Sequence, residues 1–322
     1  MKAVICTKYG SPEVLQITEV DKPVATENEV LIRIYATTVT VADIRIRSFT
    51  VPLSFWIPAR LMLGITKPKR PILGVELAGE IEAIGSKVRR FKLGDKVFAA
   101  TLPDMGTYAT HKCLPEDGMI ASMPTNSTYQ EAAAIPVGAL TALHFLKKGE
   151  ITSGQKVLIY GASGSVGTYA VQLAKHLGAE VTGVCSTSNL AWVKALGADK
   201  MIDYTEPNFA QKLETYDVIF LAVDKLPFPI CKRALRLNGI YLNVTAPVKN
   251  LEMIWTTLTT SNKLIMAHSP SKNVENLIFL KNLVESGAIR PIIDREFSLD
   301  EIVEAHRYVE KGHKKGNVVV TI

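Results

Sequence analysis

The feature that most constrains this chain is a glycine-rich turn between an apolar run and a long amphipathic segment. It lies in residues 158–189, LIYGASGSVGTYAVQLAKHLGAEVTGVCSTSN. In the dinucleotide fingerprint GxGxxG, the three small positions fall at Ala162, Gly164 and Gly167, which permit the tight turn, the approach of a pyrophosphate and close helix–strand packing. A helix is expected from Ser165, and its N–H groups would face a phosphate. The stretch predicts a dinucleotide-binding βα turn; a turn without a ligand is the alternative.

The end of the second strand of this unit indicates which dinucleotide fits. An acidic residue there would bind the ribose 2′-hydroxyl of NADH, but this strand ends in VCST, residues 184–187. Because no carboxylate stands there and the hydroxyls of Ser186 and Thr187 can donate to a 2′-phosphate, the sequence favours NADPH over NADH. Lys194 and Tyr204 could add a charge and a phenol on the same side; each is equally well an ordinary surface residue.

Composition narrows the class of protein. The chain has 322 residues, 47% of them hydrophobic and 21% charged, which is enough for two domains with cores of their own. No 18-residue uncharged apolar run is present and the N-terminus does not read as a signal peptide, so a cytoplasmic protein is expected. The net charge of +6 is spread along the chain, which fits a local phosphate site and does not indicate nucleic-acid binding.

The predicted secondary structure changes along the chain. Residues 1–122 hold short β-rich runs separated by glycine and proline, and residues 123–269 alternate strands with helices, which predicts a parallel sheet. Residues 270–322 hold an amphipathic helix, a second helix capped by Ser298 or Asp300, and a final strand. The expected fold is α/β: residues 1–122 and 270–322 form a mostly β domain, into which a doubly wound domain of residues 123–269 is inserted.

Several motifs together resemble one family. They are GASGSVGTYAVQLAKHLGA with LGADKMIDY, YGSPEVLQITEVDKP, PILGVELAGEIEAIGSKVRRFKLGDKVFA, EAAAIPVGALTALHFL and AHRYVEKGHKKGNVVVTI. Along nearly its whole length the chain resembles the quinone oxidoreductase branch of the medium-chain dehydrogenase/reductase superfamily. The resemblance implies a GroES-like catalytic domain, a Rossmann NAD(P)-binding domain and a cofactor between them. It also implies NADPH-dependent reduction of quinones or α,β-unsaturated carbonyls, commonly in a homodimer.

The zinc-dependent alcohol dehydrogenases of the same superfamily supply Cys, His and Cys or Asp ligands to a catalytic metal. Here Thr40 has no cysteine near it, and the stretch usually read Gly-His-Glu is Gly74, Val75 and Glu76. The cysteine-rich structural zinc lobe is absent as well. The four cysteines, which form no CxxC pair, are Cys6, Cys113, Cys185 and Cys231. No zinc site is therefore expected, and Glu76 is expected to serve as a hydrogen-bonding or ion-pairing residue.

Without a metal, the chemistry must rest on positioning of the hydride donor and the acceptor at about 3–3.5 Å. The candidate catalytic residues are Thr40, Asp43 and Phe49, the last of which falls in the family's substrate segment. The alternative for Thr40 and Asp43 is that they cap or brace the loop before Ile44. The predicted cofactor-binding residues are Thr141, Ala162, Ser163, Gly164, Ser165, Val166, Gly167, Ser186, Thr187, Lys194, Tyr204, Thr245 and Asn317.

The chain departs from its relatives at several places near the cofactor. Leu221 and Asp224 stand where relatives usually read DxVG. Asn189 stands where some relatives have a phosphate-binding lysine, and Asn317 where many have a lysine next to glycine. Ala246 and Pro247 replace the glycine or serine common after the fifth strand. These changes keep a second hypothesis open, an NADPH-binding scaffold or redox sensor with little turnover. An alcohol dehydrogenase is the third.

Residues 49–65, FTVPLSFWIPARLMLGI, form an apolar stretch interrupted by Pro52, Pro58 and Arg60, so it cannot be a membrane span. Three interpretations remain open. The stretch is a lid over a bulky hydrophobic substrate, a patch for peripheral contact with a membrane or partner, or a loop packed on its own domain.

Overall fold

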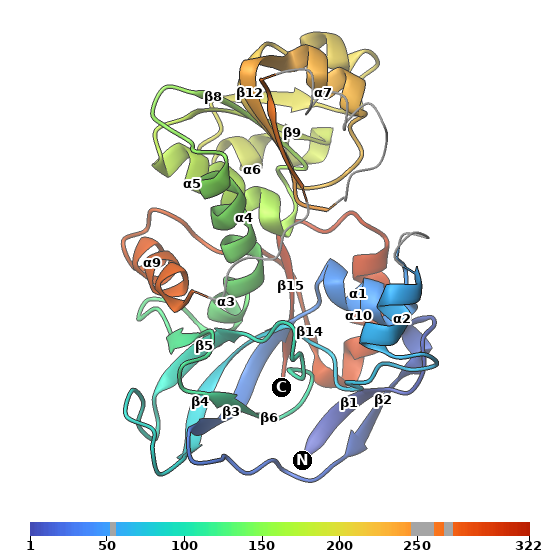
Figure 1. Ribbon diagram of the computed structural model, residues 1–322, viewed down its shortest axis with the longest axis vertical. Coiled ribbons are helices and arrows are strands. Elements are labelled where there is room, and N and C mark those ends of the chain that lie inside the picture. Colours follow the sequence, from blue (N-terminus) through green and yellow to red (C-terminus); the bar gives the residue numbers. More distant parts are fainter. Residues whose placement is uncertain (52–55, 246–260, 267–272) are drawn as a thin grey trace. The chain divides into compact units, whose positions relative to one another are not determined.

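The computed structural model describes residues 1–51, 56–245, 261–266 and 273–322, and its chain divides into two compact units (Figure 1). Unit 1 comprises Met1–Val137, Lys272–Glu285 and Pro291–Ile322, and unit 2 comprises Gly138–Ser271 and Ser286–Arg290. The expected boundary at residue 122 falls at the end of a strand, and unit 1 continues beyond it to Val137. Residues 267–272, around the second expected boundary, lie outside the described residues, as do Pro52, Ala246 and Pro247.

Unit 2 is built on a six-stranded parallel sheet with the strand order β10-β9-β8-β11-β12-β13. The strands are β8 (Lys156–Tyr160), β9 (Glu180–Cys185), β10 (Lys200–Asp203), β11 (Tyr216–Leu221), β12 (Leu235–Asn243) and β13 (Lys263–Met266). The chain moves outward in one direction from β8 to β10 and then in the other from β11 to β13. This is the doubly wound order, whose ligands bind at the carboxyl ends of the strands near the switch between β8 and β11. The predicted Rossmann fold is confirmed.

The helices of unit 2 pack on these strands: α5 lies against β8 and β9, α6 against β9 and β10, and α7 against β12 (Figure 1). Their bounds are α4 (Pro136–Lys148), α5 (Ser165–His176), α6 (Leu190–Lys194) and α7 (Phe228–Ala234), with the short 3-10 turns η3 (Thr187–Asn189) and η4 (Phe209–Lys212). Strand β8, KVLIY, is buried from Val157 to Tyr160. A continuous apolar run of this kind is what a parallel strand covered on both faces requires.

Unit 1 contains a seven-stranded sheet in the order β14-β15-β3-β4-β5-β7, with β6 also paired to β3, and a separate pair of β1 with β2. The strands are β1 (Lys2–Cys6), β2 (Leu15–Glu19), β3 (Glu29–Thr38), β4 (Glu76–Ile84), β5 (Lys96–Ala100), β6 (His111–Pro115), β7 (Ile120–Ser122), β14 (Ile293–Ser298) and β15 (Asn317–Thr321). Strand β15 pairs antiparallel with β3, with Val319 opposite Thr38. The C-terminal segment therefore belongs to the mostly β unit, and the predicted GroES-like domain is confirmed.

The helices of unit 1 are α1 (Val41–Ser48), α2 (Trp56–Leu63), α3 (Tyr129–Ala133), α9 (Val274–Glu285) and α10 (Ile302–Glu310), with the 3-10 turns η1 (Pro12–Val14) and η5 (Leu299–Glu301). Of the two expected caps near residue 300, Ser298 is the one used. The Ser298 backbone N–H and hydroxyl donate to the Glu301 carboxylate at 2.8 and 2.9 Å. This reciprocal capping box starts η5 and then α10.

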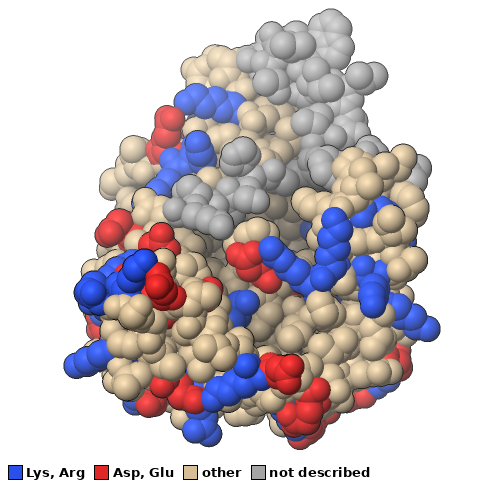
Figure 2. Space-filling model, turned by 60° about the horizontal axis from the view of Figure 1, so that its bottom comes forward, with Lys and Arg blue, Asp and Glu red and all other residues tan. Residues whose placement is uncertain are grey.

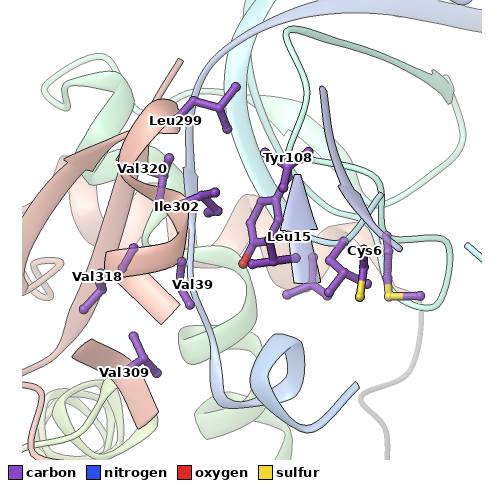
Figure 3. Packing of buried hydrophobic residues seen from close by; sticks show 14 of the residues in the cluster. Cys6, Leu15, Val39, Tyr108, Leu299, Ile302, Val309, Val318 and Val320 are labelled. Atoms are coloured by element: carbon purple, nitrogen blue, oxygen red, sulfur yellow. The ribbon is translucent and has the colours of Figure 1, made fainter. Parts of the chain in front are cut away.

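One hydrophobic cluster joins the N- and C-terminal segments within unit 1 (Figure 3). Leu299, Ile302 and Val309 from η5 and α10, together with Val318 and Val320 from β15, share this cluster with residues from the first part of the chain. Those partners include Cys6, Leu15, Val39 and Tyr108. Burial of such side chains is the main force that holds the two distant segments in one core.

A buried cation ties α1 to α10. The fully buried Arg47 guanidinium donates to the Gly10 carbonyl oxygen, to His306 Nδ1 at 3.2 Å and to the Glu310 carboxylate. Burial, together with Arg47, lowers the pKa of His306 to about 3, so the imidazole stays neutral and accepts the bond. The ring of His306 stands edge-on to Tyr108, with 5.6 Å between the ring centroids.

Charged side chains of both signs are interspersed on the face drawn in Figure 2, where Lys and Arg lie among Asp and Glu. In the described part of the chain, no helix has the length and apolar character needed to cross a bilayer.

Candidate functional site

The glycine-rich turn follows β8 directly. Gly161 has the left-handed backbone of the turn, with φ of +81°, and a Cβ added there would lie 2.8 Å from the Val223 side chain. The N–H groups of Gly161 and Ala162 both donate to the Val184 carbonyl oxygen of β9, at 3.0 and 3.1 Å. The turning role assigned above to Ala162 therefore belongs to Gly161, one residue earlier. A glycine immediately after a strand was the available signal.

The two other glycines of the fingerprint have different surroundings. A Cβ on Gly167 would lie 2.1 Å from the Gly161 carbonyl oxygen, so only glycine lets α5 lie this close to the strand. A Cβ on Gly164 would meet nothing nearer than the Gly161 oxygen at 3.5 Å, so no protein atom forbids a side chain there. The space at Gly164 is therefore free for the approach of a ligand, as the fingerprint requires of this position.

The predicted phosphate-binding residues lie together at this point. Gly164 is the N-cap of α5, and Thr168 is the residue whose N–H closes the first helical bond, to the Gly164 oxygen at 2.9 Å. A helix start of this kind presents backbone N–H groups and a positive dipole to an anion. The turn and the first helical residues consist of Ala162, Ser163, Gly164, Ser165, Val166 and Gly167. They fit the pyrophosphate of a dinucleotide.

Helix α4 runs beside the start of α5. A Cβ on Gly138 would lie 2.8 Å from Ser165 Oγ, which shows how closely the two helices approach. Thr141 is partly exposed and stands three residues further along α4, on the face that i, i+3 spacing shares with Gly138. The helix pair thus brings Thr141 toward the phosphate turn.

At the end of β9, the two predicted hydroxyls differ in their bonding. Ser186 Oγ accepts a hydrogen bond from Asn189 Nδ2 at 2.9 Å, and a hydroxyl that accepts still has its own proton to donate. Asn189 is held in turn by the Trp192 indole N–H, which donates to its Oδ1 at 2.9 Å. Thr187 Oγ1 instead donates to Asp203 at the end of the neighbouring strand β10. Of the two hydroxyls, only that of Ser186 has a proton that these bonds leave available, and its role toward a 2′-phosphate stays a prediction.

Asp203, which was not singled out from the sequence, lies at the same edge of the sheet, at the end of β10. Its Oδ1 accepts from the Thr205 backbone N–H at 2.8 Å and from the Thr205 hydroxyl at 2.7 Å. Burial opposes its ionisation, but the donors Thr187 and Thr205 outweigh that and hold the pKa of Asp203 below its ordinary value. In the sheet register Asp203 lies opposite Cys185. A charged carboxylate therefore stands one strand away from Ser186.

Of the two other candidates near this edge, Lys194 is exposed at the end of α6. Tyr204 is partly exposed, and its ring centroid lies 6.2 Å from that of Tyr160. Its backbone N–H donates to the Cys185 carbonyl oxygen at 3.1 Å, which fixes Tyr204 next to the end of β9.

At the ends of β11 and β12, a polar network holds Thr245. The buried Asn243 donates from Nδ2 to Asp224 Oδ1 and to the Tyr241 hydroxyl, each at 3.1 Å. Asn243 Oδ1 accepts from the Thr245 backbone N–H at 3.1 Å. Asp224, one of the departures from the family pattern, is thus a member of a bonded network at this edge, and Leu221 is fully buried in the core.

In unit 1, Thr40 and Asp43 form a reciprocal cap at the start of α1. Asp43 Oδ2 accepts from the Thr40 hydroxyl at 2.6 Å and from its backbone N–H at 2.9 Å, and Oδ1 accepts from the Gly74 N–H at 3.0 Å. Burial raises the pKa of Asp43, against the effect of these donors. These bonds fit the alternative given above, in which Thr40 and Asp43 cap or brace the chain before Ile44. They fix α1 and the loop at Gly74.

Phe49 ends α1 in a left-handed conformation, with φ of 53°, which is uncommon for a bulky residue. Its side chain is buried, and its ring centroid lies 4.8 Å from that of Tyr9 and 6.1 Å from that of Trp56. The ring is thus a packing element at the junction of α1 and α2.

Glu76 is the first residue of β4 and is almost fully buried. Its carboxylate accepts from the Thr38 hydroxyl and from the Val137 N–H, the latter at 2.6 Å, at the start of α4. Burial raises the pKa of Glu76 to about 7. Burial also lowers the pKa of the Lys314 ammonium to about 8, while Glu76 and then Asp294 act in the opposite sense. Lys314 is the second residue the sequence analysis missed.

Asn317 lies near Lys314 on unit 1 and begins β15. It is buried, and both its backbone N–H and its side-chain amide donate to the Ile292 carbonyl oxygen, at 2.8 and 3.2 Å. These bonds fasten β15 to the segment before β14. The cofactor role predicted for Asn317 stays a prediction.

Within the ranges that the structure describes, no group of three or more His, Cys, Asp and Glu side chains is arranged to hold a metal ion. The four cysteines are free thiols, as expected: Cys6, Cys185 and Cys231 are buried, and Cys113 is partly exposed. Burial raises the pKa of Cys6 to about 11 and that of Cys185 to about 12, which makes both poor nucleophiles.

A two-unit fold with a dinucleotide turn in a doubly wound sheet defines a class of nucleotide-dependent oxidoreductases, and comparison with known proteins identifies the family. Residues 26–145 match the family described as alcohol dehydrogenase GroES-like domain, and residues 196–320 match the one described as zinc-binding dehydrogenase. The chain is 31% identical to the chloroplast envelope quinone oxidoreductase homolog of Arabidopsis thaliana, over 99% of this chain and 98% of the relative.

A second relative, the NADPH-dependent alkenal/one oxidoreductase of Arabidopsis thaliana, is 28% identical over 99% of this chain and 79% of the relative. The solved structure of the quinone oxidoreductase from Coxiella burnetii superposes with a TM-score of 0.88 at 29% identity, covering 100% of this chain and 99% of that one. The chain belongs to the medium-chain dehydrogenase/reductase superfamily, in its quinone oxidoreductase-like branch. It is an NAD(P)H-dependent oxidoreductase of that branch.

The two glycines of the turn should respond differently to the same substitution. Gly167→Ala should lower the free energy of unfolding by about 2 kcal/mol, because the methyl group meets the Gly161 backbone oxygen. Gly164→Ala should change it by less than about 1 kcal/mol but weaken NAD(P)H binding at least about tenfold, since the methyl group enters the space for the pyrophosphate. Urea unfolding and calorimetric titration measure the two effects. Equal losses of stability in both variants would contradict this account of the turn.

The raised pKa of Glu76 predicts a pH dependence of stability. Between the ordinary carboxyl pKa of 4.5 and about 7, the folded protein keeps a proton that the unfolded chain has lost. The free energy of unfolding should therefore fall as pH rises through this window, by about 2 kcal/mol. Glu76→Gln, whose amide can serve both Thr38 and Val137, should remove this fall.

The measurement is the difference in unfolding free energy between Glu76→Gln and the unmodified protein from about pH 5 to about pH 7. Other titrating groups cancel in this difference, which should grow with pH. Glu80→Gln, on the same strand but partly exposed, controls for the loss of a charge from β4. A difference that stays constant with pH would show that Glu76 does not carry the effect.

Proposed function

We propose that this protein is an NADPH-dependent, zinc-independent reductase that delivers hydride to a quinone or to the β-carbon of an α,β-unsaturated carbonyl. The observation that carries the proposal is the βα turn of unit 2, where α5 starts at Gly164 with open space at its Cβ position. The names of the two relatives and of the solved structure support the acceptor class. Thr40 and Val75, at positions where zinc enzymes place ligands, support independence from zinc.

When bound, NADPH supplies the hydride, and the acceptor gains that hydride and a proton, so that NADPH, H⁺ and quinone give NADP⁺ and quinol. The residues of this chain supply binding and orientation. The start of α5 would hold the pyrophosphate through backbone N–H groups. The Ser186 hydroxyl would donate to the 2′-phosphate. Thr40 and Asp43 position α1 and the Gly74 loop, and we assign them this positioning role on the basis of their reciprocal bonds.

The experiment is a direct assay of NADPH oxidation with naphthoquinones, enals and enones. Turnover with at least one of these acceptors, unchanged by EDTA, is the expected result. Loss of activity with EDTA that zinc alone restores would contradict the proposal and favour an alcohol dehydrogenase. Tight NADPH binding with no turnover on any acceptor would favour the scaffold or redox sensor, for which the altered Asp224 network is the observation. Light scattering in the same buffer tests the predicted homodimer.

Cofactor preference should depend on Ser186 and Asp203. NADPH should bind more tightly than NADH, and Ser186→Asp should reverse that order by placing a carboxylate beside the 2′-phosphate. Asp203→Asn keeps one oxygen to accept from Thr205, and its Nδ2 can donate to the Thr187 hydroxyl in place of the present bond, but it removes a negative charge near that phosphate. It should tighten NADPH binding by roughly fivefold, or about 1 kcal/mol, with less effect on NADH.

Asp199→Asn is the matched control for Asp203→Asn. Asp199 precedes the same strand at its amino end, where it accepts from Lys175 Nζ at 2.6 Å and from the Val181 N–H at 2.8 Å. Asp199→Asn removes one negative charge, as Asp203→Asn does, but at the opposite end of β10. It should leave the ratio of the NADPH and NADH affinities unchanged. Calorimetric titrations of NADPH and NADH give this ratio. Equal affinities in the unmodified protein would count against the proposed preference.

A further inference from the structure

A surface helix usually turns its charged side chains to water, but helix α2 turns its charged residue, Arg60, toward the protein. The Arg60 guanidinium carbon lies 3.7 Å from the centre of the Phe49 ring and 4.9 Å from the ring centres of Tyr9 and Trp56. Its Nη1 donates to the Ile65 carbonyl oxygen, while its Nε is buried without a hydrogen-bond partner. Cation–π contacts with three rings thus anchor the helix through its charged residue.

The outward side of the same helix is apolar. Ile57, Leu61, Met62 and Ile65 are 68%, 65%, 69% and 71% exposed, and Trp56 is 44% exposed. Residues 57 and 61 are one helical turn apart, and residue 62 is adjacent to that row. In the described part of the chain 15 large hydrophobic residues are exposed, and five of them fall within residues 56–65. Clustering of this kind marks an interaction surface, whereas single exposed apolar residues do not.

The chain segment around this helix is basic. Residues 44–75 contain six lysines and arginines and no aspartate or glutamate. Lys67, Lys69 and Arg70 are exposed directly after the apolar residues. Arg70 pairs with Asp104 at 2.6 Å and Lys69 Nζ donates to the Leu61 carbonyl oxygen at 2.7 Å, whereas Lys67 makes no ion pair within the described residues. The helix therefore presents apolar side chains bordered by basic ones.

This combination identifies the occupant. An interfacial helix places apolar side chains among the acyl chains of a bilayer and basic ones among the anionic headgroups. A second copy of this chain packed on the same surface would bring the same basic segment against it, which is repulsive. The eight residues of α2 are too few to cross a bilayer, so the contact must be peripheral.

We propose that the α2 surface, formed by Trp56, Ile57, Leu61, Met62, Ile65 and Lys67, docks this protein on an anionic lipid bilayer. The proposal selects one of the three interpretations that the sequence left open for residues 49–65. It does not rest on the proposed function, because binding to lipid needs neither cofactor nor acceptor.

The test is sedimentation of the full-length protein with vesicles, without cofactor. The protein should bind vesicles of phosphatidylcholine mixed with phosphatidylglycerol more tightly than vesicles of phosphatidylcholine alone, and added salt should weaken the binding. Leu61→Gln should reduce the partition coefficient about tenfold, because it removes one inserted apolar side chain. Lys67→Gln should reduce it roughly fivefold, and only on the anionic vesicles.

Leu93→Gln is the matched control, since Leu93 is 61% exposed in the same unit but lies far from α2 in the sequence. It should bind vesicles like the unmodified protein, and thermal unfolding of all variants checks that each is folded. Failure of the unmodified protein to bind anionic vesicles would overturn the proposal. An equal loss of vesicle binding in Leu93→Gln would also overturn it. A change of molecular mass in Leu61→Gln would indicate contact between copies instead. A raised KM for bulky acceptors in Leu61→Gln, without loss of lipid binding, would indicate a lid.

Discussion

The contact between Gly167 and the carbonyl oxygen of Gly161 sets the geometry of the nucleotide-binding unit. It lets α5 begin directly on the backbone of the strand it follows, with no side chain between them. Because α5 starts there, its first N–H groups lie at the carboxyl edge of β8, and the ends of β9 and β10 carry Ser186 and Asp203 to the same edge. The absence of a Cβ atom at Gly167 thus lets α5 start at the edge of the sheet where an anion can bind, close to the ends of β9 and β10.

Unit 1 is organised by a different constraint, which is the burial of charge. Asp43, Glu76 and Arg47 are each almost fully removed from water, and each is held by backbone groups as well as by side chains. Asp43 binds the Gly74 N–H, Glu76 binds the Val137 N–H, and Arg47 binds the Gly10 carbonyl oxygen. Since a buried charge without partners is very unfavourable, these bonds make the loops around α1 and the start of α4 more specific than hydrophobic packing alone would.

Much of the fold could be predicted from the sequence, because its signals are local. The strand–turn–helix pattern and the alternation of strands and helices predicted the parallel sheet, and the Ser298 cap was one of two possibilities. The residues that were missed depend on partners from other strands or distant segments. Asp203 is held by Thr187 in the turn that follows the adjacent strand β9, and Lys314 is influenced by Glu76, more than two hundred residues away in sequence. Gly161 could have been found, since it directly follows β8; Arg60 could not, because its aromatic partner Tyr9 is remote in sequence.

The position of β15 has a consequence for the order in which the protein is made. β15 lies inside the sheet of unit 1, between β14 and β3, and follows every residue of unit 2 in the chain. On the ribosome, strands β3 to β7 therefore emerge early, and residues 36–38 of β3, beyond the stretch that β6 pairs, stay without their β15 partners while all of unit 2 is synthesised. All described strands of unit 2 have been synthesised before the last two strands of unit 1, β14 and β15, emerge. Synthesis thus reverses the usual order in which N-terminal domains fold first, and the short unpaired edge at residues 36–38 of β3 is the surface that needs protection in the nascent chain.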